Sequence, residues 1–144
     1  MSTENKAIVR RTLEELWNKG NLAVADEVTG ANHVGHDPAV PNPGRGPQAE
    51  KQLVTMYRTA FPDLNITIDE MMADGDKVVT RWTSRGTHKG DLMGVAPTGK
   101  QVNITGITID RIAGGKAEES WTNWDTLGMM QQLGVVPQMT AARA

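Results

Sequence analysis

The sequence predicts an α+β domain in which helices pack on one face of a strongly curved antiparallel sheet. Apolar residues recur at helical spacing before Pro62, and from Leu64 onward they alternate with polar ones. The alternation shifts by one residue at Gly106, which predicts a β-bulge and a bend in the sheet. We expect a bent sheet with helices on its concave side to enclose a pocket.

The first part of the chain is predicted to be mainly helical. Apolar residues at helical spacing predict a helix over 2–20, which stops at Gly20, and a shorter helix over 21–28. The segment 32–37 is too short and mixed for a helix, so we expect it to be extended. This extended piece places two histidines just before a loop.

Residues 38–47 contain four prolines and two glycines, and this composition predicts a loop. Pro47 suits the first turn of the next helix, because its missing N–H would have no helical partner there. That helix ends at Pro62. Four strands joined by turns are then predicted over residues 64–69, 78–87, 102–112 and 117–124. A last short helix is expected over 126–133.

The length and composition are those of one globular domain, 1–144, with a weakly structured tail at 135–144. The absence of cysteine excludes disulfides, thiolate nucleophiles and thiolate zinc sites. Three histidines are few for a histidine-rich metal cage, so we expect no metal. The glycines form neither a GxGxxG motif nor a P-loop, so we expect no cofactor. A net charge of -2 without a basic run argues against a nucleic-acid partner. No segment is long and apolar enough to cross a membrane, so we expect a cytoplasmic protein.

Asp125 is the first candidate catalytic residue. Alternation along the last strand places it on the same face as Trp121 and Asn123. A carboxyl at the floor of an apolar cavity has its pKa raised by desolvation, so that it can act as a general acid or base. Alternatively, Asp125 caps the helix that follows. The two interpretations are compatible.

The histidines and Arg81 are further candidates. His33 and His36 are three residues apart in an extended segment, so they point to opposite sides and only one can face a pocket. His88 follows the second strand, where the alternative is a hydrogen-bonded loop histidine. Arg81 lies in the middle of that strand. An inward Arg81 would need a carboxylate partner or an anionic ligand, and an outward one would lie on a solvated face.

Several short motifs follow one another in a specific order: Phe61-Pro62-Asp63-Leu64, Gly75-Asp76-Lys77-Val78, Arg81-Trp82-Thr83, Gly86-Thr87-His88-Lys89-Gly90, Pro97-Thr98-Gly99-Lys100 and Glu119-x-Trp121-x-x-x-Asp125. With this order and spacing, the chain resembles the SnoaL-like polyketide cyclases, within the nuclear transport factor 2-like fold. The resemblance implies a cone-shaped, cystatin-like sheet with helices on its concave face, and a homodimer formed through the outer face. It also implies an intramolecular aldol condensation without metal or Schiff base.

By this resemblance, Asp125 is the catalytic carboxylate, with His36 and His88 as helpers. The expected ligand is a small apolar or aromatic polyketide-like molecule. The residues expected to bind it are Trp121, Asn123, Arg81 and Trp17.

Other functions of the same fold are alternatives. A limonene-type epoxide hydrolase would carry Arg-x-Asp on one strand, where this chain has Arg81-Trp82-Thr83. Ketosteroid isomerase and scytalone dehydratase relatives use pocket tyrosines, and this chain has only Tyr57. A non-catalytic module that binds a small hydrophobic ligand or dimerises is the third alternative.

Overall fold

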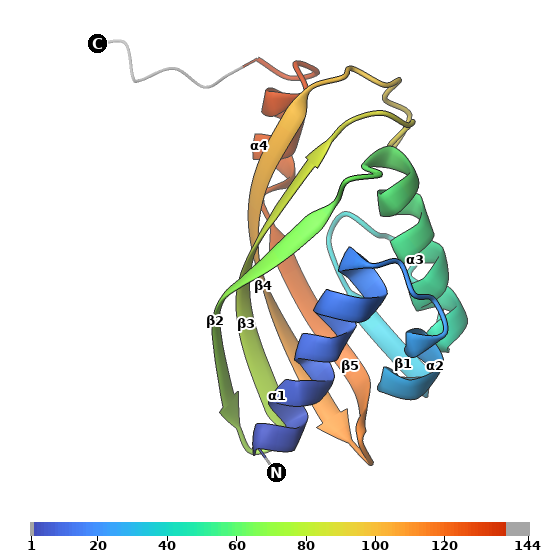
Figure 1. Cartoon of the computed structure of the whole chain (residues 1–144), viewed down its shortest axis with the longest axis vertical. Helices are drawn as coiled ribbons and strands as arrows, with labels where there is room; N and C mark the ends of the chain where they lie inside the picture. The colour runs from blue at the N-terminus through green and yellow to red at the C-terminus, as the bar shows by residue number, and fades with distance from the viewer. Residues whose placement is uncertain (1, 138–144) are drawn as a thin grey trace.

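A computed structural model describes residues 2–137 and confirms the predicted α+β class. Five strands form one curved, unclosed sheet in the order β1-β5-β4-β3-β2, and α1, α2 and α3 lie along one side of it (Figure 1). Most of the tail predicted at 135–144, from residue 138 on, lies outside the described residues. No helix in the described part of the chain is long and apolar enough to cross a membrane.

The strands are β1 (Thr29–His36), β2 (Asn65–Asp74), β3 (Lys77–Thr87), β4 (Gln101–Ala113) and β5 (Lys116–Trp124). From β2 to β5 each strand pairs antiparallel with the next, as predicted. The extended segment predicted at 32–37 lies in β1 up to His36, and β1 pairs in parallel with β5 at the sheet edge.

The helical elements are α1 (Ser2–Arg11), η1 (Thr12–Asn18), α2 (Val24–Val28), α3 (Gly46–Ala60) and α4 (Thr126–Gln132). The helix predicted over 2–20 is thus two pieces, because the π-helix η1 continues α1. The Thr12 hydroxyl donates to the Ile8 carbonyl at 2.9 Å where the two pieces meet. Pro47 lies in the first turn of α3, as its missing N–H predicts.

The apolar core holds the helices against the sheet. Leu16, Val24 and Val54 are buried where η1, α2 and α3 meet. Phe61 and Met129 belong to a second cluster, which joins the end of α3 and α4 to the sheet. Burying such side chains contributes about 1.5–3 kcal/mol each, so the inward faces of η1 and α3 are fixed relative to the strands.

The β-bulge predicted at Gly106 is wrong. β3 and β4 pair without interruption from Lys77 opposite Arg111 to Thr87 opposite Gln101. The irregular steps lie elsewhere, between Arg111 and Ile112 against β5 and in β2 between Ile68 and Glu70.

Gly106 instead makes room for an indole ring. It lies opposite Trp82, and a Cβ at this position would overlap Trp82 Cζ2. The apolar alternation shifts there because Ile107 and Ile109 are apolar residues of the outer sheet face, with Ile107 49% exposed.

We expect Gly106→Ala to destabilise the fold by about 1–3 kcal/mol, because the new methyl group overlaps the Trp82 ring. The free energy of unfolding in urea measures the loss. Gly35→Ala is the matched control, since a Cβ there meets only His33 Cε1 at 3.7 Å and should change stability by about 0.5 kcal/mol or less. Equal losses in the two variants would contradict this role for Gly106.

Candidate functional site

A cavity of about 360 Å³ lies between the sheet and the helical layer. Its lining is mainly apolar and includes residues of α1, η1, α3, α4 and the inner sheet face. Val40, Asn42, Pro43 and Gly44 of the proline-rich loop also line it. Its volume and lining are those of a binding site for a small organic molecule.

The strand register decides which polar side chains enter the cavity. On β5 the cavity is lined by Ala117, Ser120, Thr122 and Trp124. Asp110 of β4 lies opposite Ser120, and Thr108 lies opposite Thr122. The two threonine hydroxyls are 3.0 Å apart, and Trp82 Nε1 donates to Thr108 Oγ1 at 3.0 Å. The wall therefore presents one carboxyl group among hydroxyls and indole rings.

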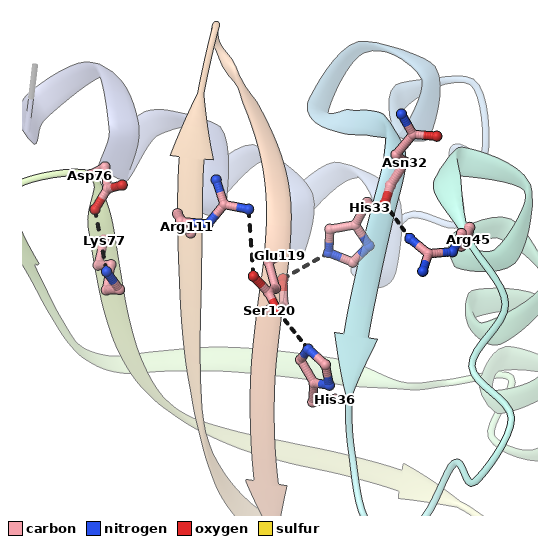
Figure 2. A network of polar contacts seen from close by, with 9 residues as sticks. All are labelled: Asn32, His33, His36, Arg45, Asp76, Lys77, Arg111, Glu119 and Ser120. Carbon is pink, nitrogen blue, oxygen red and sulfur yellow. Dashed lines mark hydrogen bonds and ion pairs between the residues drawn. The ribbon is translucent and has the colours of Figure 1, made fainter.

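Asp110, Ser120 and His33 form a hydrogen-bonded chain in this wall. Ser120 Oγ donates to Asp110 Oδ1 at 2.5 Å, and His33 Nε2 lies 2.9 Å from Ser120 Oγ. Figure 2 shows the imidazole of His33, on β1, directed at Ser120. Because the hydroxyl has one proton, and Asp110 receives it, His33 Nε2 must donate to Ser120. Burial lowers the pKa of His33, which favours this neutral, singly protonated form.

Two carboxyl groups of the cavity, those of Asp110 and Glu50, have raised pKa values. Burial raises the pKa of Asp110 to about 6, and the hydrogen bond from Ser120 opposes this shift. Burial, and then the charge of Asp110, raise the pKa of Glu50 on α3 to about 7. Trp17 Nε1 donates to Glu50 Oε1 at 3.3 Å. No lysine or arginine is among the described residues that line the cavity, so neither carboxyl faces a cation there.

An aromatic wall completes the site. The ring of Tyr57 lies 6.0 Å from that of Trp17 and meets that of Trp124 edge-on at 6.2 Å. Trp124 Nε1 donates to the Asp37 carboxylate, 3.0 Å from Oδ2 and 3.2 Å from Oδ1. Asp37 in turn accepts from the Ala39 backbone N–H at 2.8 Å, which ties the proline-rich loop to the indole.

The expectation that Asp125 lies at the cavity floor is wrong. Its side chain is exposed and outside the described cavity lining, and its Oδ1 accepts from the Gly128 backbone N–H at 2.8 Å. It caps α4, which is the alternative that the sequence also allowed. The reason is parity, because Trp124 is the last inward residue of β5.

Trp121 and Asn123 also lie on the outer face, which corrects their predicted place in the pocket. The Trp121 ring stacks on His36 with centroids 5.5 Å apart and planes at 21°. Asn123 is exposed and opposite Ile107. Arg81 is on the same outer face, where its Nε lies 3.3 Å from Glu70 Oε1. Of the two orientations that the sequence allowed, it therefore has the outward one.

His33 and His36 point in opposite directions, as their spacing predicts. Both nevertheless line the cavity, so the expectation that only one of them can face a pocket is wrong. His33 contacts Ser120, whereas His36 is exposed and its Nε2 lies 2.7 Å from Glu119, which also pairs with Arg111 at 3.5 Å (Figure 2).

His88 is fully buried outside the described cavity lining. Its Nδ1 accepts from the Thr98 backbone N–H at 3.2 Å, so it anchors the loop between β3 and β4. Of the predicted substrate-binding residues, Trp17 alone lines the cavity.

Two functional candidates are missing from the sequence-based prediction, Glu50 and Asp110; His33 is among its candidates, but the resemblance implies a role for His36 instead. An uninterrupted alternation from Val102 would have placed Asp110 on the inner face. Glu50 lies three residues before Leu53 and seven before Tyr57, which is the spacing of one helix face. No group of three or more histidine, aspartate or glutamate side chains in the described residues is arranged to hold a metal ion.

Comparison with known proteins places this site in context. The family model of the SnoaL-like polyketide cyclases matches residues 7–133. The chain is 29% identical to the aklanonic acid methyl ester cyclase DnrD of Streptomyces peucetius, over 93% of this chain and 92% of that one. A solved structure of a candidate polyketide cyclase from Acidithiobacillus ferrooxidans is 35% identical, with a TM-score of 0.83 over 92% of this chain and 95% of that one. The structure of TsrD from Streptomyces laurentii gives a TM-score of 0.84 at 25% identity, over 93% and 97% of the two chains.

The raised carboxyl pKa values make stability depend on pH. In the unfolded chain both carboxyl groups titrate at about pH 4, so between that pH and about pH 7 the folded state binds more protons than the unfolded state. Their contribution to stability is therefore complete below about pH 4 and is lost as the pH rises through about 6 to 7. We expect the unfolding free energy of Glu50→Gln, relative to that of the native sequence, to increase over this range in urea titrations. If the difference in unfolding free energy between Glu50→Gln and the native sequence does not change with pH, the raised carboxyl pKa values are contradicted.

Proposed function

The chain belongs to the SnoaL-like polyketide cyclase family, and from this premise we propose that it is a cyclase-like enzyme whose reaction takes place in the cavity. The reaction proposed is an intramolecular aldol condensation, or a related reaction through an enolate. The observation that carries the proposal is the Asp110 carboxyl, held in a mainly apolar cavity with one oxygen fixed by Ser120.

The proposed substrate is a small, uncharged, aromatic or apolar polyketide-like molecule. Asp37, Glu50 and Asp110 line the cavity and no lysine or arginine is among its described lining residues, so an anionic ligand is disfavoured. Trp17 and Trp124 offer flat apolar surfaces on which an aromatic ring can pack. The relative from Streptomyces peucetius is named for a methyl ester, in which the charge of a carboxylate is removed.

Asp110 is the proposed general base. Its Oδ2 has no hydrogen-bond partner among the described residues and is not enclosed by them, so it is available to a ligand in the cavity. A base of pKa about 6 is ionised at neutral pH and can remove a proton from the carbon next to a carbonyl. The enolate carbon then attacks a second carbonyl of the same molecule. Ser120 and His33 hold Asp110 in position.

A homodimer through the outer sheet face is a second part of the proposal. Met72, Val79, Ile109 and Trp121 lie opposite one another on four neighbouring strands and form an apolar row across that face. Met72 is 54% exposed, and Ile107 beside the row is 49% exposed. Contiguous apolar surface of this kind favours association with a second copy.

Asp110→Asn is expected to lower kcat by about 10²–10⁴-fold, because the amide cannot accept the proton. The probe is ortho-acetylphenylacetone, an aromatic diketone that an internal aldol condensation converts to a fluorescent methylnaphthol. Asp125→Asn is the matched control and should keep nearly full activity, since Asp125 is an exposed helix cap.

Loss of turnover in Asp125→Asn together with normal turnover in Asp110→Asn would reverse this assignment. If the native chain is stabilised thermally by the diketone and forms no product, the protein is a ligand-binding module.

Ile107→Lys is expected to shift the protein from dimer to monomer in sedimentation velocity, because a charge replaces an apolar contact at the centre of the outer face. The cavity lies on the other face, so thermal stability should change little. Gln48→Lys, an exposed change on α3, controls for the added charge. A native chain that sediments as a monomer would refute the dimer.

A further inference from the structure

Glu50 stands in the cavity with no structural reason to be a carboxylic acid. It lies in the second turn of α3, on the helix face that also carries Leu53 and Tyr57. Its only hydrogen bond to a described residue is the one that Oε1 accepts from Trp17 Nε1 at 3.3 Å. The carbonyl oxygen of a glutamine would accept that bond equally well, without the cost of placing an ionisable group in an apolar cavity.

The environment of Glu50 opposes the charged form and leaves one oxygen available. No lysine or arginine lines the described cavity, and Asp110 repels a second negative charge. Glu50 Oε2 has no hydrogen-bond partner among the described residues and is not enclosed by them. The cavity therefore has two carboxyl groups with one free oxygen each, one on the helix side and one on the sheet side.

The two groups differ in which form the protein favours. Each carboxyl accepts one hydrogen bond that favours its ionised form, Asp110 from Ser120 and Glu50 from Trp17, but only at Glu50 does a neighbouring charge, that of Asp110, add to the effect of burial. Between about pH 6 and pH 7 this favours the proton on Glu50 and the charge on Asp110. Pairs of carboxyl groups in different environments commonly divide acid and base roles in this way.

We propose that Glu50 is the general acid that acts with Asp110 in the same condensation, an assignment that rests on the function proposed above. Asp110 Oδ2 takes a proton from the ligand carbon, and the C–H electron pair becomes the enolate. The enolate carbon forms a bond to the acceptor carbonyl carbon, whose π electrons move to oxygen. That oxygen takes the proton from Glu50 Oε2. Transfer of a proton from Asp110 to Glu50 through solvent restores both groups, so protons balance.

The test compares Glu50→Gln with Asp110→Asn in two assays. The first is the pH profile of kcat for cyclisation of ortho-acetylphenylacetone. The second is deuterium exchange into the methyl group of acetophenone in heavy water, followed by NMR. Acetophenone has only the carbonyl next to the reacting methyl group and no acceptor carbonyl. Exchange therefore needs the base and does not need the acid.

Glu50→Gln is expected to lose about 10²–10³-fold in kcat and to lose the alkaline limb of the pH profile, while acetophenone exchange stays within about tenfold of the native rate. Asp110→Asn should lose both activities. Glu50→Asp, which restores a carboxyl, should recover the alkaline limb with a lower kcat. Glu14→Gln on the surface of η1 is the matched control and should change neither assay.

Normal cyclisation with an intact alkaline limb in Glu50→Gln would overturn the role of Glu50 and leave the proposed function standing. A parallel loss of cyclisation and exchange in Glu50→Gln would also overturn it, because Glu50 would then only position the base. A native chain that shows neither activity would overturn both proposals.

Discussion

The register of β4 between β3 and β5 is the constraint on which the site depends. It sets Asp110 opposite Ser120 and Gly106 opposite both Trp82 and Trp124, all on the inner face. A slip of one residue would move every inward side chain of β4 to the outside. Gly106 helps to fix this register, because the Trp82 ring occupies the space that a side chain would fill. The packing of Trp82 against Gly106 therefore helps to keep Asp110, on the same strand β4, on the inner face.

The electrostatics of the cavity follow from that placement. A mainly apolar cavity with acidic groups and no described lysine or arginine resists charge, so its carboxyl groups hold protons at higher pH than they would in water. The same property selects uncharged ligands and brings the acid–base groups close to neutral pH, where proton transfer in both directions is effective. One physical cause thus accounts for the proposed ligand class and for the proposed chemistry.

Much of the fold could be predicted from the sequence, and most of the site could not. The change from helical spacing to alternation, with prolines and glycines at the boundaries, locates the elements from α3 to α4 within a few residues. The site was misplaced because β4 and β5 carry apolar residues on both faces, so alternation alone could not tell the inner face from the outer one. A large apolar residue such as Trp121 is expected to face the core, and Asn123 and Asp125 share its strand face. Because Trp121 lies on the outer face, the prediction assigned all three to the wrong side of the sheet. The extended form of 32–36 could be predicted locally, but the parallel pairing of β1 with β5 could not, because β5 is distant in sequence.

Carbon-13 NMR titration of the side-chain carboxyl groups tests the central claim most directly, with Glu50→Gln and Asp110→Asn used to assign the two resonances. The account predicts that one resonance titrates near pH 6 and the other near pH 7, and that Asp110→Asn lowers the Glu50 midpoint by removing the neighbouring charge. Two midpoints near about 4, unaffected by either substitution, would show that the carboxyl groups are ordinary solvated ones and would contradict the account.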